Sequence, residues 1–210
     1  MFTDMQIDRF TEELASNAPV PGGGGASALC GALAAALASM VANLTLKSAK
    51  YQLVHADMNN LVEKAKELRL TLLSLIDEDA KAFEPLSQAY RLPKETDEEK
   101  AMRRGVLEAA LKEAVKPPLA ILKTANGILD LLCEAKEKGT KLAVSDVGVG
   151  ALFAVAAMRG AALNVFINTS LMEDRKTADA LEEECRTYEA DFERGTLLYK
   201  QVEVMVCRKS

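Results

Sequence analysis

A carboxylate at position 79 is the side chain whose place in the sequence most favours chemistry. Asp79 falls in a series of residues that alternate steps of four and three, the spacing of one packing face of a helix. The other members are apolar: Leu61, Ala65, Leu68, Leu72, Leu75, Ala82 and Leu86. A carboxylate there is either paired or has a raised pKa, and both conditions suit proton transfer. The structural alternatives are a buried ion pair with a cation such as Arg159 and a face that turns outward locally. From spacing alone, a structural role and a catalytic role have about equal weight.

A second carboxylate, Asp146, lies in the segment Ser145-Asp146-Val-Gly-Val-Gly150. Either Ser145 or Asp146 can cap the helix that follows, and spacing alone favours capping over catalysis. Farther along, Asn164 and Asn168 lie one helical turn apart on the same face. Two amides placed in this way could bind the polar edge of a heterocycle. Hydrogen bonding between helices in a crowded core is the alternative, and it is at least as favoured.

A run of four glycines forms the third candidate site. Gly22, Gly23, Gly24 and Gly25 follow the rigid segment Pro19-Val20-Pro21 and precede an Ala-rich helix over residues 26–46. Glycine lets a partner approach the main chain closely, and a helix start offers unpaired N–H groups with a partial positive charge. We therefore expect a bare backbone loop that could bind an anion.

The elements that must position these residues all have helical patterns. A capping box of Thr3 and Gln6 predicts a first helix that reaches about Ser16. A long helical pattern covers residues 51–90, and a charged loop then leads to Thr96 and Glu99, which cap the next helix.

The second half of the chain has the same character. Pro117 and Pro118 end one helix and start another, residues 136–145 form a loop, and a second apolar helix runs to about Thr169. The last helix carries one apolar stripe: Leu181, Cys185, Tyr188, Phe192, Tyr199, Val202 and Val206. No window alternates as a strand would. The prediction is an all-α, single-domain helical bundle over residues 1–210 with a long central Ala-rich helix.

Composition excludes several classes of function. The chain has 210 residues, 49% apolar and 27% charged, and a net charge of −5 that argues against binding to nucleic acid. Four cysteines without CxxC spacing and one histidine predict no metal site. Free thiols and the lack of a signal sequence predict a cytoplasmic protein. Residues 26–46 are long enough to span a membrane, but Asn43, Thr45 and the abundance of alanine favour the centre of a bundle instead.

Five segments resemble, in order, the motifs of the formiminotransferase-cyclodeaminase C-terminal family. They are residues 18–26, 39–45, 79–83, 145–150 and 159–168, so the resemblance covers nearly the whole chain. The family includes folate cyclodeaminases and methenyltetrahydrofolate cyclohydrolases. The resemblance implies an all-helical fold and a homodimer or larger assembly.

The resemblance also implies chemistry at the one-carbon bridge of tetrahydrofolate. A cyclohydrolase adds water to the carbon of 5,10-methenyltetrahydrofolate and yields 10-formyltetrahydrofolate. A cyclodeaminase lets N10 attack a formimino carbon on N5 and expels ammonia. We expect the cyclohydrolase, because the chain stands alone, without the formiminotransferase domain of fused relatives. The alternatives are the cyclodeaminase and a non-catalytic folate-binding or structural helical dimer.

Roles for particular residues follow from the resemblance. Asp79 and Asp146 would share proton transfer and stabilisation of the cation, in an order that the sequence leaves open. The substrate-binding candidates are Gly22, Gly23, Gly24, Gly25, Asn43, Lys50, Tyr51, Ser145, Arg159, Asn164 and Asn168. Among them, Lys50 and the glycine N–H groups would receive the glutamate tail of a mono- or polyglutamylated folate, and Tyr51 would contact the pterin. No cofactor is expected beyond the tetrahydrofolate substrate.

Two departures from the family pattern are visible. The chain has Lys47-Ser-Ala-Lys50-Tyr51 where the family commonly has Gly-Lys-Lys-Lys-Tyr. It has Gly139-Thr-Lys-Leu-Ala-Val-Ser145 where the family often has Gly-Asn-x-Asn-Ser. These missing lysines and asparagines are what motivate the non-catalytic alternative.

Overall fold

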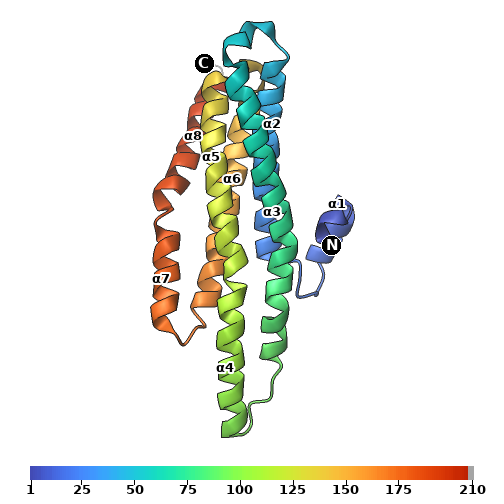
Figure 1. The fold of residues 1–210 in the computed structure, drawn as a ribbon, viewed down its shortest axis with the longest axis vertical. Helices are drawn as coiled ribbons and strands as arrows, with labels where there is room; N and C mark the ends of the chain where they lie inside the picture. The colour runs from blue at the N-terminus through green and yellow to red at the C-terminus, as the bar shows by residue number, and fades with distance from the viewer. Residues whose placement is uncertain (208–210) are drawn as a thin grey trace.

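The structure is a computed structural model that describes residues 1–207. Within this range the chain forms eight α-helices, three short 3₁₀ helices and no strand (Figure 1). The α-helices are α1 (Ile7–Leu14), α2 (Gly23–Leu46), α3 (His55–Tyr90), α4 (Asp97–Ala114), α5 (Lys116–Lys138), α6 (Val144–Thr169), α7 (Arg175–Arg186) and α8 (Glu189–Val206). The 3₁₀ helices are η1 (Phe2–Asp4), η2 (Ala49–Val54) and η3 (Lys141–Ala143). The predicted all-α class is confirmed.

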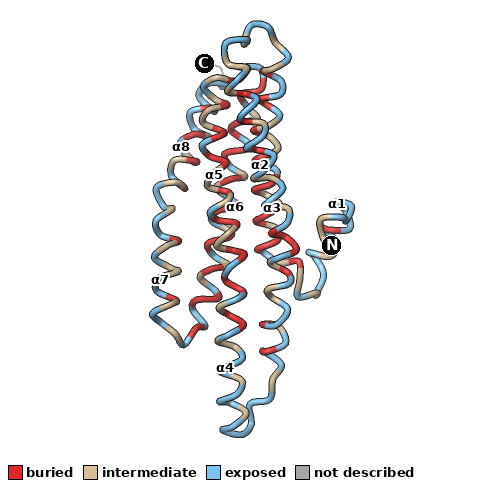
Figure 2. Tube along the Cα trace, viewed as in Figure 1, coloured by how far each residue is buried: buried red, intermediate tan, exposed pale blue. Residues whose placement is uncertain are grey.

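The core lies where α2, α3, α5 and α6 face one another. α2 packs against α3, α5 and α6, and α6 packs in addition against α7 and α8. Figure 2 shows buried positions along the facing sides of these helices, whereas the free end of α4 is largely exposed. The charge-free sequence of α2 suits its place in the core, because a helix with apolar residues on several sides is stabilised by packing against several other helices.

Small residues bring α2 and α6 close together. A Cβ added at Gly160 of α6 would meet the hydroxyl of Ser27 on α2, and one added at Gly150 would lie 3.6 Å from the backbone oxygen of Ala34 on α2. Ser27 is itself buried and donates a hydrogen bond to the carbonyl of Gly23 at 2.7 Å. This close approach places Gly160 and Asn164 of α6 directly beside the start of α2.

Several predicted boundaries are confirmed and others are wrong. Thr96 and Glu99 form the expected capping box, and α5 begins at the predicted proline pair. The predicted capping box of Thr3 and Gln6 is wrong, because the hydroxyl of Thr3 donates to Asp77 at 2.9 Å and the N-cap of α1 is Gln6. The helix ends at Leu14, two residues before the predicted Ser16.

Three more corrections concern segment ends. The predicted loop at residues 136–145 is mostly helical, because α5 continues to Lys138 and α6 begins at Val144. The long pattern at 51–90 begins as η2 before α3 starts at His55. The last predicted helix is two helices, α7 and α8, with Val206 exposed at the end of the stripe.

α2 and the segment Lys141–Thr169 are each long and apolar enough to cross a membrane, judged by length and composition. In the bundle both pack against several other helices, and both bury polar side chains, Thr45 and Asn168 among them. Core helices of bundles have the same composition. The expected absence of a membrane span therefore stays a prediction.

Candidate functional site

Asp79 of α3 lies directly against the start of α2. A Cβ at Gly24 would overlap both oxygens of the Asp79 carboxylate, so a side chain at that position would displace the carboxylate. The N-cap residue of α2, Gly22, provides no side-chain cap, and the backbone N–H of Gly25 hydrogen-bonds to the carboxylate of Asp79. The predicted glycine loop is thus wrong in detail: three of its glycines form the first turn of α2, which is capped from another helix.

Burial controls the charge of Asp79. It raises the pKa of this carboxyl to about 6, and the hydrogen bond from Gly25 only partly opposes the rise. No Lys or Arg in the part of the chain that the structure describes forms an ion pair with Asp79. The proposed partner Arg159 pairs instead with Glu193 at 3.3 Å, and its guanidinium lies 4.7 Å from the ring centroid of Phe192. The raised pKa is therefore the correct one of the alternatives for Asp79.

The two asparagines of α6 have different surroundings. Asn164 lies against the start of α2, with its Nδ2 3.2 Å from the position of a Cβ on Gly23, and donates to the carbonyl of Gly160 at 2.8 Å. Asn168 is buried and donates to the carbonyls of Ala114 at 3.3 Å and Asn164 at 3.0 Å. Asn168 thus holds α6 against the end of α4, and Asn164 alone joins Asp79 at the start of α2. We call Asp79, Asn164 and the glycines at positions 23–25 the Asp79 group.

A second group surrounds a pocket of about 500 Å³ at the other end of α2. Its lining residues are Leu44, Ser48, Lys50, Tyr51, Thr140, Lys141, Leu142, Ala143 and Asp146. η2 supplies Lys50 and Tyr51, and the first turn of α6 supplies Asp146. Asp146 is not a helix cap, because the N-cap of α6 is Ala143 and no side chain caps it. We call Lys50, Tyr51 and Asp146 the Asp146 group.

Hydrogen bonds fix the position of Tyr51 in this pocket. The fully buried Thr45 of α2 accepts from the backbone N–H of Thr140 at 2.8 Å. Thr140 hydrogen-bonds through its side chain to the Tyr51 hydroxyl, and the backbone N–H of Lys141 donates to the same oxygen at 3.4 Å. The bond from Thr140, followed by that from Lys141, lowers the pKa of Tyr51. Sequence patterns missed Thr45 and Thr140, although Thr140 lies in a segment that departs from the family motif.

The remaining candidates stand apart from both groups. Asn43 is exposed on α2 and donates to the carbonyl of Ser39 at 2.9 Å. Ser145 is exposed, and it does not line the pocket beside its neighbour Asp146. Within residues 1–207, no three His, Cys, Asp or Glu side chains are grouped in a way that could hold a metal ion.

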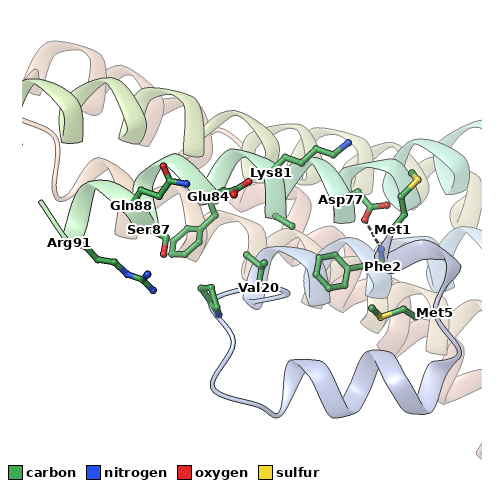
Figure 3. A pocket seen from close by; sticks show the side chains of 13 residues that line it. Met1, Phe2, Met5, Val20, Asp77, Lys81, Glu84, Ser87, Gln88 and Arg91 are labelled. Carbon is green, nitrogen blue, oxygen red and sulfur yellow. Dashed lines mark hydrogen bonds between the residues drawn. The ribbon is translucent and has the colours of Figure 1, made fainter.

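Another cavity, of about 650 Å³, contains no predicted site residue (Figure 3). It lies between the N-terminal segment and the outer face of α3, with Phe2 and Val20 on one side and Lys81 and Arg91 on the other. The buried carboxylate of Asp77 closes one end by accepting a hydrogen bond from the backbone of Phe2 at 2.7 Å. The carboxylate oxygens of Asp77 are thus engaged in holding the N-terminal segment.

The Asp79 and Asp146 groups lie at opposite ends of α2. This helix has 24 residues, so at 1.5 Å per residue it separates the groups by about 36 Å. One reacting carbon cannot touch both carboxylates within a single copy of the chain.

Comparisons with known proteins give a consistent result. A family model described as Formiminotransferase-cyclodeaminase matches residues 6–187. Methenyltetrahydrofolate cyclohydrolase from Methylorubrum extorquens is 47% identical over 82% of this chain and 83% of its own length. Formimidoyltransferase-cyclodeaminase from Mus musculus is 34% identical over 81% of this chain, which spans only 32% of the mouse protein. The crystal structure of formiminotetrahydrofolate cyclodeaminase from Thermotoga maritima has a TM-score of 0.87 and 31% identity, over 99% of this chain and 100% of that one.

Proposed function

Because the chain belongs to the formiminotransferase-cyclodeaminase family, we propose that it hydrolyses 5,10-methenyltetrahydrofolate to 10-formyltetrahydrofolate. The relative that is named as a cyclohydrolase supports this choice, since it is more similar in sequence than the mouse and Thermotoga cyclodeaminases. The observation that carries the proposal is the desolvated Asp79 carboxylate at the start of α2, whose pKa is raised to about 6. We further propose that the enzyme is cytoplasmic and acts without a metal or nucleotide cofactor.

Asp79 has the properties of a general base in this reaction. The methenyl substrate carries a positive charge shared between N5, N10 and the bridging carbon, and attack by water forms a tetrahedral carbon. The attacking water must lose a proton. A carboxyl with a pKa of about 6 is mainly ionised at neutral pH, and its conjugate acid can still return a proton. Asp146 would supply the second carboxylate, which stabilises the cation before attack.

A second copy of the chain is required if both carboxylates act on one carbon. Two copies that pack antiparallel along α2 would bring the Asp79 group of one copy to the Asp146 group of the other. In this arrangement the N–H groups at positions 23–25 and Lys50 would meet in one site. They would offer positive potential to the glutamate tail of the substrate, including a polyglutamate tail.

The surface of the bundle supports such a dimer. α2 and α6, which pack against each other, both expose apolar side chains: Leu33, Met40, Leu44, Val149, Leu152, Leu163 and Ile167. Near the pocket of the Asp146 group, Leu53 is 100% exposed and Leu142 is 97% exposed. Exposed apolar side chains on two neighbouring helices favour an interaction surface, and a two-fold dimer would cover them in both copies.

The activity is tested by following methenyltetrahydrofolate absorbance with purified protein, after the spontaneous rate has been subtracted. We expect accelerated loss of the absorbance with release of 10-formyltetrahydrofolate. The cyclodeaminase reaction is the second candidate, favoured by the named mouse and Thermotoga proteins. Ammonia release from formiminotetrahydrofolate would establish it. A folded protein that accelerates neither reaction would leave the non-catalytic folate-binding alternative.

The shared site is tested by mixing two inactive variants. Asp79→Asn and Asp146→Asn are refolded together, so that half of the dimers are hybrids with one intact site and one doubly altered site. Activity should return to about a quarter of the wild-type value. Each variant refolded alone is the control. No recovery in hybrids that have formed would contradict a site shared between two copies.

A further inference from the structure

The hydroxyl of Tyr51 has two hydrogen-bond partners. It accepts from the backbone N–H of Lys141 at 3.4 Å, and it forms a second hydrogen bond with the side chain of Thr140. A backbone N–H can only donate, whereas a threonine hydroxyl can donate or accept. When Thr140 donates, the O–H bond of Tyr51 can point into the pocket that it lines together with Lys50 and Asp146.

This support extends into the core of the protein. Thr140 is buried, and its backbone is held by Thr45, which in turn donates to the carbonyl of Val41 at 2.8 Å. A chain of hydrogen bonds thus connects α2 to the tyrosine. Such a buried, satisfied network holds a side chain in one orientation.

The surroundings of Tyr51 also favour its ionised form. The charged groups that line the pocket with it are Lys50, Lys141 and Asp146. The ammonium of Lys50 lies 5.7 Å from the ring centroid, so one face of the ring already has a partner. Two donors and two nearby cations stabilise a phenolate against the single carboxylate. Stabilisation of the conjugate base is what a residue needs if it is to release a proton.

We propose that Tyr51 is a catalytic acid, which gives its phenolic proton to N5 of the substrate when the bond between N5 and the one-carbon unit breaks. The inference rests on the proposed hydrolysis of the methenyl group and adds a third reacting group to it. This role of Tyr51 is distinct from the contact with the pterin that the family resemblance implies.

The step balances without any further reactant. Water forms a bond from its oxygen to the bridging carbon, and one of its protons passes to the Asp79 carboxylate. The bond from this carbon to N5 then breaks, its electron pair stays on N5, and the Tyr51 proton neutralises that nitrogen. The hydroxyl that remains on the carbon loses its proton to solvent as the formyl C=O forms. The phenolate recovers a proton from the carboxyl of Asp79 through solvent. The sum of these steps is the addition of one water molecule to the methenyl cation and the release of one proton.

Tyr51→Phe separates proton donation from ring contact, because phenylalanine keeps the ring and removes the hydroxyl. We expect kcat to fall by roughly 10²- to 10⁴-fold, with KM changed by less than about threefold. Tyr90→Phe, at the far end of α3, is the control and should keep its activity. A Tyr51→Phe enzyme whose kcat stays within about threefold of wild type would overturn the proposal.

Thr140→Val tests the orientation of the hydroxyl without removing it. Loss of this donor should lower kcat and move the alkaline limb of the kcat–pH profile to higher pH, since the phenol then ionises less readily. A purely structural role of Thr140 would not move that limb, and an unmoved limb would count against the proposal. Wild-type protein without turnover in either folate assay would refute the proposed function itself, which separates that failure from the failure of Tyr51 alone.

Ultraviolet titration of the four tyrosines gives a readout that does not depend on turnover. Tyr90 and Tyr199 have raised pKa values, the first through burial and the second through its hydrogen bond to Glu203. Tyr51 should therefore ionise before both of them, and the earliest phase should be absent from Tyr51→Phe. An unchanged earliest phase would show that Tyr51 lacks the stabilised phenolate on which the proposal depends.

Discussion

Asp79 must be ionised to act as a base, but its burial in the folded protein favours the protonated form. Burial raises its pKa from 3.8 to about 6, so the folded protein binds this proton more tightly than the unfolded chain does. The resulting stabilisation is present below pH 4 and is lost as the pH rises to about 6 and above. At neutral pH, where we propose that the ionised form acts as a base, the carboxylate therefore destabilises the fold.

Asp79→Asn should consequently abolish activity and make the protein more stable at pH 7. The expected gain in the free energy of unfolding is up to about 3 kcal/mol at pH 7, from a shift of about two pKa units at 1.36 kcal/mol each. The gain should vanish near pH 4, where the wild-type carboxyl is protonated in both states. Urea denaturation of both proteins at the two pH values measures it, and a variant less stable than wild type at pH 7 would contradict it.

The pH profile of kcat/KM gives a second prediction for the same residue. If ionised Asp79 takes the proton from water, kcat/KM should rise tenfold per pH unit below pH 6 and level off above pH 7. Loss of methenyl absorbance between pH 5 and 8, corrected for the spontaneous reaction, provides the measurement. A constant kcat/KM between pH 5 and 7 would remove Asp79 from the role of base.

At the scale of single elements, the start of α2 depends on the absence of one side chain. Gly24→Ala adds a methyl that collides with the Asp79 carboxylate, whereas Gly105→Ala, in the middle of α4, adds one into open space. Both changes favour a helix by roughly 0.5–1 kcal/mol. Gly105→Ala should therefore raise the melting temperature and keep full activity. Gly24→Ala should reduce kcat strongly by displacing the carboxylate, and equal activities of the two variants would contradict this account.

The same elements show where sequence patterns stop being informative. The spacing around Asp79 identified the one polar residue on a packing face, because a period of 3.6 residues reports which side of a helix is buried. The glycine run was interpreted as a loop because its cap comes from Asp79, more than fifty residues away, and capping rules consider only local neighbours. The capping role predicted for Ser145 and Asp146 failed because α6 starts two to three residues earlier than a cap at either position implies.

At the scale of the whole molecule, composition and periodicity were enough to predict an all-helical chain with an apolar central helix. They did not predict that the candidate residues divide between two ends of that helix. Periodicity fixes the face of a helix on which a residue lies, but the end that it occupies relative to distant residues depends on how the helices pack. The resemblance to a family gave the candidate residues as one set, and the fold shows that one copy holds the Asp79 and Asp146 groups about 36 Å apart.

The exposed apolar face of α2 and α6 leads to a prediction about assembly. Leu163 is 67% exposed on α6 and Leu197 is 53% exposed on α8, outside that face. Because a two-fold interface contains each substitution twice, Leu163→Glu should place two carboxylates in an apolar contact and give a monomer. Light scattering should show twice the mass of 22.7 kDa for wild type and for Leu197→Glu, and the single mass for Leu163→Glu. The monomer should keep its helical circular dichroism and lose turnover, since each copy retains only half of every site. A fully active Leu163→Glu monomer would refute both the proposed dimer and the shared site.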